Sequence, residues 1–178
     1  MNYGFINLNN DANEVPIKVY YNEDDSLKQV KQDMIKDHSD FKKFRVVESL
    51  EEKIMQEFLS WLRFVEYDEN ITLIMQYQSA AITAANKYRR GDESDSDDED
   101  TSKGFKAKDL PPLTVRNERK VIEKIYKLAK EQYEKYNTTL EEDLKILAEK
   151  PDMSFNESNC VLYRSGEKKI LKFLMETT

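Results

Sequence analysis

The chain has 178 residues, with 28 Lys and Arg against 35 Asp and Glu, and a formal net charge of −7. Seven of the acids lie within residues 92–100, which leaves 28 acids against 28 bases elsewhere. A neutral body with one acidic run lacks the cationic excess of nucleic-acid binders, so we expect basic protein partners and no direct nucleic-acid binding. Because no apolar stretch approaches the ~18 residues of a membrane helix and no signal-peptide pattern opens the chain, we expect no membrane association and an intracellular, nuclear or cytoplasmic location.

Two short extended segments are predicted near the N-terminus. Apolar and polar residues alternate over residues 14–21, with Pro16 early in the run, which is typical of a short edge strand. A second short extended stretch is expected over residues 41–47. The first segment is expected to act as a connector.

A helix is predicted between these two segments. Leu27, Val30 and Met34 recur at helical spacing, and Ser26 is placed to cap the first turn. We expect the helix to stop near His38. This is the only histidine, and its polar surroundings favour a solvated side chain over a catalytic one.

Residues 49–66 give a clear amphipathic signal for a core helix, with Ser49 and Glu52 spaced as a capping box. Its apolar residues are Leu50, Ile54, Phe58, Trp61, Leu62 and Val65. Asn70 starts a further helix, whose Ala-rich end would let a neighbouring helix approach closely.

Residues 91–109 are predicted to be a disordered loop. They show no apolar periodicity and dense like charge, so they bury too little surface to offset the entropy of ordering. Ser94 and Ser96 each precede an acid by three residues and are possible phosphorylation sites. Pro111 and Pro112 mark the return to regular structure.

The C-terminal third predicts three helices. A long helix over about residues 114–136 carries Ile122, Ile125, either Leu128 or Ala129, Gln132 and Tyr136 on its inner side. Thr138 and Thr139 provide the cap of a short helix that bears Leu140, Leu144 and Leu147. The last helix holds Val161, Leu162, Ile170, Phe173 and Leu174.

Two residues of the last helix carry separate expectations. Gly166 costs about 1 kcal/mol relative to Ala inside a helix, so either the helix breaks there or a close contact needs the missing side chain. Cys160, the single cysteine, excludes an internal disulfide and is expected to be a small buried apolar residue and not a nucleophile.

Together these elements predict a mainly α protein, a bundle of about five to seven helices with a short N-terminal extended segment. No Cys/His cluster, phosphate loop or nucleophile elbow appears in the sequence, so no metal, nucleotide or hydrolase site is expected.

The two ends of the chain resemble one enzyme family. Tyr3-Gly4-Phe5, followed by asparagines, Asp11 and Glu14-Val15-Pro16-Ile17, is similar to the seam where Rubisco large-subunit lysine methyltransferases leave their SET domain. Residues 162–171, with Arg164, Gly166-Glu167-Lys168 and Ile170-Leu171, look like the closing helix of that family's C-terminal substrate-binding domain. The acidic insertion and the spacing look most like the branch of SET-domain-containing protein 6 and the yeast ribosomal-protein lysine methyltransferases.

The resemblance implies a division into residues 1–10, the end of a SET domain, and residues 11–178, a helical substrate-binding domain interrupted by 91–109. S-adenosylmethionine would be the cofactor of the parent enzyme. Phe5 would lie near its adenine, Gly4 would let the backbone come close, and Tyr3 would flank the substrate-lysine channel. Tyr3 and Phe5 are also suited to packing at a domain junction. The family's catalytic residues precede this seam, so the chain alone is expected to be inactive.

By the same resemblance, the helical body would grip a basic protein, ribosomal or histone-like, and present its lysine to the upstream SET domain. Glu141-Glu142-Asp143 is an acidic run suited to such a partner, or simply a solvated helix face. The alternative function is a stand-alone acidic helical interaction module, an adaptor or histone chaperone that uses residues 92–100.

Overall fold

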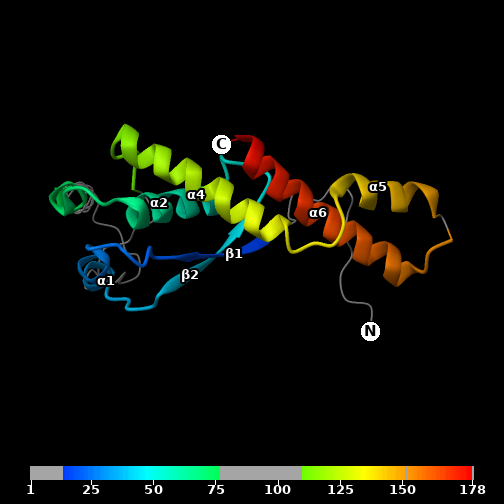
Figure 1. The fold of residues 1–178 in the computed structure, drawn as a ribbon, viewed down its shortest axis with the longest axis horizontal. Coiled ribbons are helices and arrows are strands. Elements are labelled where there is room, and N and C mark those ends of the chain that lie inside the picture. The colour runs from blue at the N-terminus through cyan, green and yellow to red at the C-terminus, as the bar shows by residue number, and fades with distance from the viewer. Residues whose placement is uncertain (1–13, 77–109, 151, 178) are drawn as a thin grey trace, which may run out of the picture. The chain divides into compact units, whose positions relative to one another are not determined.

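The computed structural model describes residues 14–76, 110–150 and 152–177. Helices predominate in this part of the chain, and its two strands form one small sheet (Figure 1). The predicted mainly α fold with a short N-terminal extended segment is confirmed. No described helix has an apolar stretch long enough to cross a lipid bilayer.

The chain divides into two compact units, which we describe separately. The first comprises the described residues of Met1–Val19, Lys43–Phe58 and Ile122–Thr178, and the second those of Tyr20–Lys42 and Leu59–Val121. Phe44 packs on Phe58 in the first unit, with ring centroids 5.6 Å apart. In the second, Trp61 contacts Tyr21 edge-on at 6.1 Å and lies 5.6 Å from Phe64. Each unit therefore has aromatic packing of its own.

Both predicted extended segments form strands, β1 (Val15–Tyr20) and β2 (Phe41–Val46), which pair with each other. In β1, buried and exposed residues alternate strictly, because successive side chains of a strand point to opposite faces. The N–H of Tyr21 donates to the Asp40 carbonyl at one end, and Arg45 reaches Glu14 at the other, so the strands run antiparallel.

The helix between the strands, α1 (Lys28–Ile35), differs from its prediction at both ends. Asp25, and not Ser26, receives a hydrogen bond at its start, from the N–H of Leu27 at 2.9 Å. The helix ends at Ile35, because Lys36 adopts a left-handed conformation with φ of 52° and caps it. Val30 is exposed while Lys31 is buried, so the apolar residues do not mark the buried face.

Helix α2 (Lys53–Glu66) is the predicted core helix, with Phe58, Leu62 and Val65 fully or nearly fully buried. It begins at Lys53, so the predicted capping box of Ser49 and Glu52 does not open it. Residues 71–76 are helical, and the Asn70 side chain accepts from the N–H of Thr72, as an N-cap does. The rest of that predicted helix and the predicted loop 91–109 lie outside the described residues.

Helix α4 (Val115–Tyr133) buries a line of residues four apart along the chain: Asn117, Val121, Ile125 and Ala129. Ile125 and Ala129 were expected on this face, but Ile122 is 44% exposed, so its predicted burial is wrong. One residue along a helix is a turn of about 100°, which moves Ile122 away from the line that contains Val121.

Helix α5 (Leu140–Glu149) and helix α6 (Phe155–Thr177) pack against each other (Figure 1). In α5, Leu140 and Asp143 are buried while Leu144 is exposed, which contradicts its predicted core position. Asp143 takes the buried side of the helix because its hydrogen-bond partners, Arg164 and Lys168, lie on α6.

Helix α6 runs without interruption through Gly166, so of the two alternatives for this residue a helix break is excluded. Val161, Ile170 and Leu174 are buried as predicted. Cys160 is exposed, so the expectation that it is a buried apolar residue is wrong. The buried line of α6 in this region consists of Val161, Ser165 and Lys168. Cys160 lies one residue before Val161 and therefore off that line.

Candidate functional site

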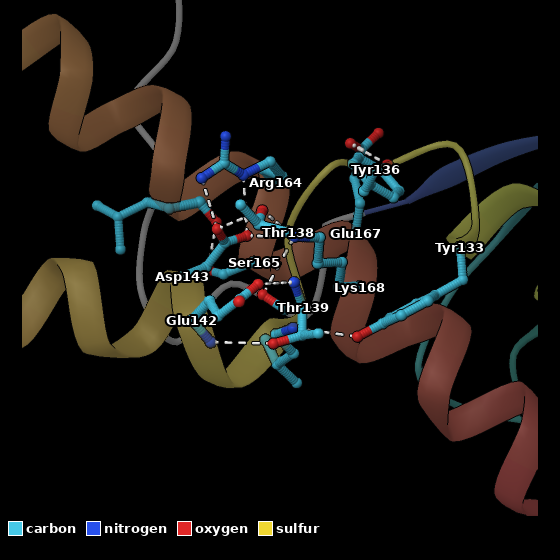
Figure 2. Close-up of polar contacts among 12 residues, drawn as sticks. Tyr133, Tyr136, Thr138, Thr139, Glu142, Asp143, Arg164, Ser165, Glu167 and Lys168 are labelled. Carbon is cyan, nitrogen blue, oxygen red and sulfur yellow. Dashed lines mark hydrogen bonds and ion pairs between the residues drawn. The ribbon is translucent and has the colours of Figure 1, made fainter.

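The most concentrated polar structure of the first unit lies where α5 meets α6 (Figure 2). It consists of Thr138, from the turn before α5, Asp143 of α5, and Arg164 and Lys168 of α6. We call these four residues the α5–α6 cluster. Both Asp143 and Lys168 have fully buried side chains.

Asp143 is the centre of the cluster. Arg164 donates to both of its oxygens, from Nε to Oδ2 at 2.9 Å and from its second guanidinium nitrogen to Oδ1. The Thr138 hydroxyl donates to Oδ1 at 2.8 Å, and Lys168 Nζ donates to Oδ2 at 2.6 Å. The bidentate guanidinium fixes the plane of the carboxylate as well as its charge.

Lys168 directs its amine into the same cluster. Nζ lies 2.6 Å from Asp143, 2.7 Å from the Thr138 hydroxyl and 3.2 Å from the Thr139 carbonyl. An ammonium group has three hydrogens, and these three acceptors use all of them. The amine also lies 5.2 Å from the centroid of the Tyr136 ring, within the range of a cation–π contact.

The environment of Asp143 acts on its pKa in two directions. Burial raises the pKa of the carboxyl, but the hydrogen bonds from Arg164, Lys168 and Thr138 outweigh it and lower the pKa to about 2. The same contact raises the pKa of Arg164. The acid is therefore a permanent anion at physiological pH.

Further hydrogen bonds tie the neighbouring turns to the cluster. The Tyr136 hydroxyl donates to Glu167 at 2.7 Å, and burial together with this carboxylate raises the pKa of Tyr136. Thr139 and Glu142 form a capping box at the start of α5, which confirms the predicted cap. The N–H of Leu140 donates to the hydroxyl of Tyr133.

This arrangement is suited to holding helices in place and not to catalysis. The carboxylate and the amine at its centre use their hydrogen-bonding capacity on each other and on the adjacent turn, and both are inaccessible to solvent. Three residues of the closing-helix sequence, Arg164, Glu167 and Lys168, thus hold α5 and the turn before it against α6.

A second buried lysine lies in the second unit. Lys31 donates to Asp25 at 2.6 Å and to the carbonyl of Val65 at 2.7 Å, and both side chains are almost entirely buried. Burial lowers the pKa of Lys31, with Asp25 opposing that shift. In the same unit Arg63 makes a bidentate ion pair with Glu118, the shortest contact being 2.9 Å.

The residues predicted to line the cofactor pocket and substrate channel, Tyr3, Gly4 and Phe5, lie outside the described residues, as do Ser94 and Ser96. The acidic run of α5 has partners inside the chain. Glu141 pairs with Lys172, Glu142 closes the capping box, and Asp143 is buried. His38 has a side chain that is 62% exposed, as expected for a solvated histidine.

The buried charges were missed from the sequence, although one signal was present. Asp143 lies three residues after Leu140 and four before Leu147, so it stands in the middle of the apolar line of α5. A charge on such a line indicates a buried ion pair. Its partners, 21 and 25 residues further on, have no sequence signal that connects them to it.

A family model described as Rubisco LSMT substrate-binding matches residues 22–171. The matched region begins just after β1 and reaches into the last turns of α6, so it includes all four residues of the α5–α6 cluster. No curated protein matches the chain.

Proposed function

Because the chain belongs to the Rubisco LSMT substrate-binding family, we propose that it binds and positions the protein substrate of an S-adenosylmethionine-dependent protein-lysine N-methyltransferase. The observation that carries this proposal is the match over residues 22–171, which takes in elements of both units. The SET domain that performs the transfer belongs to the parent enzyme.

The chemistry of lysine methylation explains why such a domain is useful. The target amine has to be held in line with the methyl donor, so the rate depends mainly on positioning. A positioning surface needs a fixed scaffold, because small displacements reduce the rate strongly. The α5–α6 cluster supplies fixed geometry of this kind with buried, fully hydrogen-bonded charges.

We propose a basic protein, such as a ribosomal protein, as the substrate. Support comes from the charge distribution, since residues 92–100 contribute seven acids to an otherwise neutral chain. Glu141, Glu142 and Asp143 are engaged within the chain. Residues 92–100 are therefore the better candidate for attracting basic segments of a partner.

Tyr3, Gly4 and Phe5 remain the proposed contacts of the chain with the cofactor and the lysine channel. When bound, S-adenosylmethionine supplies the methyl group. The chain contributes at most one edge of its pocket, and the transfer itself is assigned to the SET domain.

The test is transfer of a labelled methyl group from S-adenosylmethionine to a mixture of basic ribosomal proteins. Three samples are compared: this chain, a SET domain of the same family, and the two joined. We expect activity only in the joined protein. Full activity of the SET domain alone would contradict the proposal and favour the adaptor function.

A matched pair of variants sharpens the test. Asp143→Asn in the joined protein loosens the α5–α6 cluster and is expected to raise KM for the protein substrate more than it lowers kcat. Glu134→Gln changes an exposed acid just after the end of α4, whose contact with Lys130 is 4.0 Å long, and should leave both constants unchanged. Equal effects of the two variants would count against a positioning role.

A further inference from the structure

The small sheet leaves one edge of each strand open. Within the described part of the chain it consists of β1 and β2, so each strand pairs on one side only (Figure 1). The hydrogen bond from the N–H of Tyr21 to the carbonyl of Asp40, together with the bounds of the strands, sets the register. Antiparallel strands exchange hydrogen bonds at every second pair, so the backbone groups of Lys43 and Arg45 point away from β1.

The outer edge of β2 keeps donors that the outer edge of β1 lacks. By the same alternation Pro16 is an outward position of β1, and proline has no N–H to donate. On β2 the outward N–H and C=O groups of Lys43 and Arg45 form no hydrogen bond with any described residue. The next outward position, Val47, donates its N–H to the sulfur of Met55 at 3.5 Å, so the open edge ends there. An open edge of this kind is a template for a further strand.

The side chains along this edge are mainly positive. Lys43 and Arg45 lie two residues apart, on the same side of β2, and both are exposed. Lys18, which is also exposed, lies directly across from Lys43 in the register and belongs with it to the first unit. Glu14 pairs with Arg45 at 2.6 Å and offsets one of the three charges. The remaining excess of positive charge favours an acidic partner.

We propose that the outer edge of β2 binds an extended acidic segment of another protein, which joins the sheet as a third strand. The backbone groups of Lys43 and Arg45 hold its main chain, and acidic side chains at every second position lie beside Lys43, Arg45 and Lys18. A second copy of β2 is disfavoured, because its own basic side chains would meet like charges. The inference goes beyond the proposed function, since that function concerns a basic substrate.

Hydrogen exchange of single amides tests the contact. The probe is a short synthetic peptide in which Glu alternates with Thr, added to the full chain. At saturating peptide we expect exchange of the Lys43 and Arg45 amides to slow by about tenfold or more, because they gain acceptors. The Phe44 amide points toward β1 and should exchange as before.

Two control peptides separate strand addition from simple charge attraction. The first has Lys in place of every Glu, and the second keeps the Glu side chains but has methyl groups on its backbone nitrogens. Neither should protect Lys43 or Arg45, because the first repels the basic edge and the second lacks donors for the outward carbonyls.

Substitutions at position 43 separate the backbone from the charge within the chain. Lys43→Pro removes the outward N–H and leaves the hydrogen bonds to β1 in place, as Pro16 does in β1, so protection of Arg45 by the Glu peptide should be lost. Lys43→Gln is the matched control. It removes the charge alone, so binding should weaken several-fold while protection at saturating peptide remains.

Three outcomes would overturn the proposal, and all are read in the unsubstituted chain, so they hold even if Lys43→Pro does not fold. The first is equal protection by the Glu and Lys peptides, and the second is equal protection by the methylated peptide. The third is protection of Lys43 and Arg45 before any peptide is added, because another segment of the chain would then occupy the edge.

Discussion

At the scale of single residues, Asp143 is the centre of the polar contacts between α5 and α6. It is fully buried and is ion-paired with Lys168, which is also fully buried, and with Arg164. Removing one partner of a buried pair leaves the other uncompensated, and that costs far more than the pair contributes when intact.

We therefore expect Asp143→Asn to reduce the free energy of unfolding by about 3–5 kcal/mol, the usual cost of breaking a buried pair. Chemical denaturation followed by circular dichroism measures the change as a shift of the midpoint. Glu134→Gln, which changes an exposed acid just after the end of α4, serves as the control and should leave the midpoint in place. Similar midpoints for the two variants would mean that the buried charges are not coupled as described.

The lowered pKa of Asp143 also predicts a dependence of stability on pH. The folded pKa is about 2 and the ordinary value is 3.8, so the unfolded state binds the proton more readily. The stabilisation is complete above about pH 4 and is lost as the pH falls toward 2, by about 2 kcal/mol in total. Unfolding measured from pH 6 to pH 2 should show the difference between the original chain and Asp143→Asn shrinking by that amount. A difference that stays constant over this range would exclude the assigned pKa.

At the scale of elements, burial in α1 and α5 follows polar contacts, whereas in β1 and α2 it follows the apolar pattern. The position and type of most elements could be predicted, because strand alternation, the α2 pattern and the Thr139 cap are local signals. The orientation of α1 and α5 could not, since Lys31 and Asp143 are buried through partners distant in sequence. Among the candidate site residues, the Arg and Gly-Glu-Lys of the closing helix were identified by resemblance, and their buried partner was not.

The capping box of α5 gives a test at this scale. Thr139→Ala removes the side-chain acceptor for the N–H of Glu142 and should cost about 1 kcal/mol, whereas Thr139→Ser keeps the acceptor and should cost little. Denaturant midpoints of the two variants measure the difference. Because the N–H of Glu142 loses its side-chain acceptor, hydrogen exchange should accelerate in the first turn of α5 in Thr139→Ala. Equal midpoints for Ala and Ser would contradict the cap.

At the scale of the whole molecule, each unit has its own ionic contacts. The first unit holds the α5–α6 cluster, and the second holds Lys31 with Asp25 and Arg63 with Glu118. The residues of the two sets do not overlap, so substitutions in one unit should not alter the partners of the other.

This independence predicts additive effects. Arg63→Lys loses the bidentate geometry toward Glu118 and should cost about 1 kcal/mol. Combined with Thr139→Ala, the loss in unfolding free energy should equal the sum of the single losses to within about 0.5 kcal/mol. A double-mutant cycle from denaturant unfolding measures this. A coupling well above that margin would show that the units respond to each other.

The two buried lysines have a consequence for the chemical reactivity of the chain. Lys31 and Lys168 have side chains with no exposed surface, and their amines are committed to acceptors within the fold. Acylating reagents, and lysine-modifying enzymes in general, act on amines that they reach from solvent. Exhaustive acylation of the folded chain will therefore leave these two lysines unmodified. The time at which label appears at either lysine will show when the unit that contains it opens.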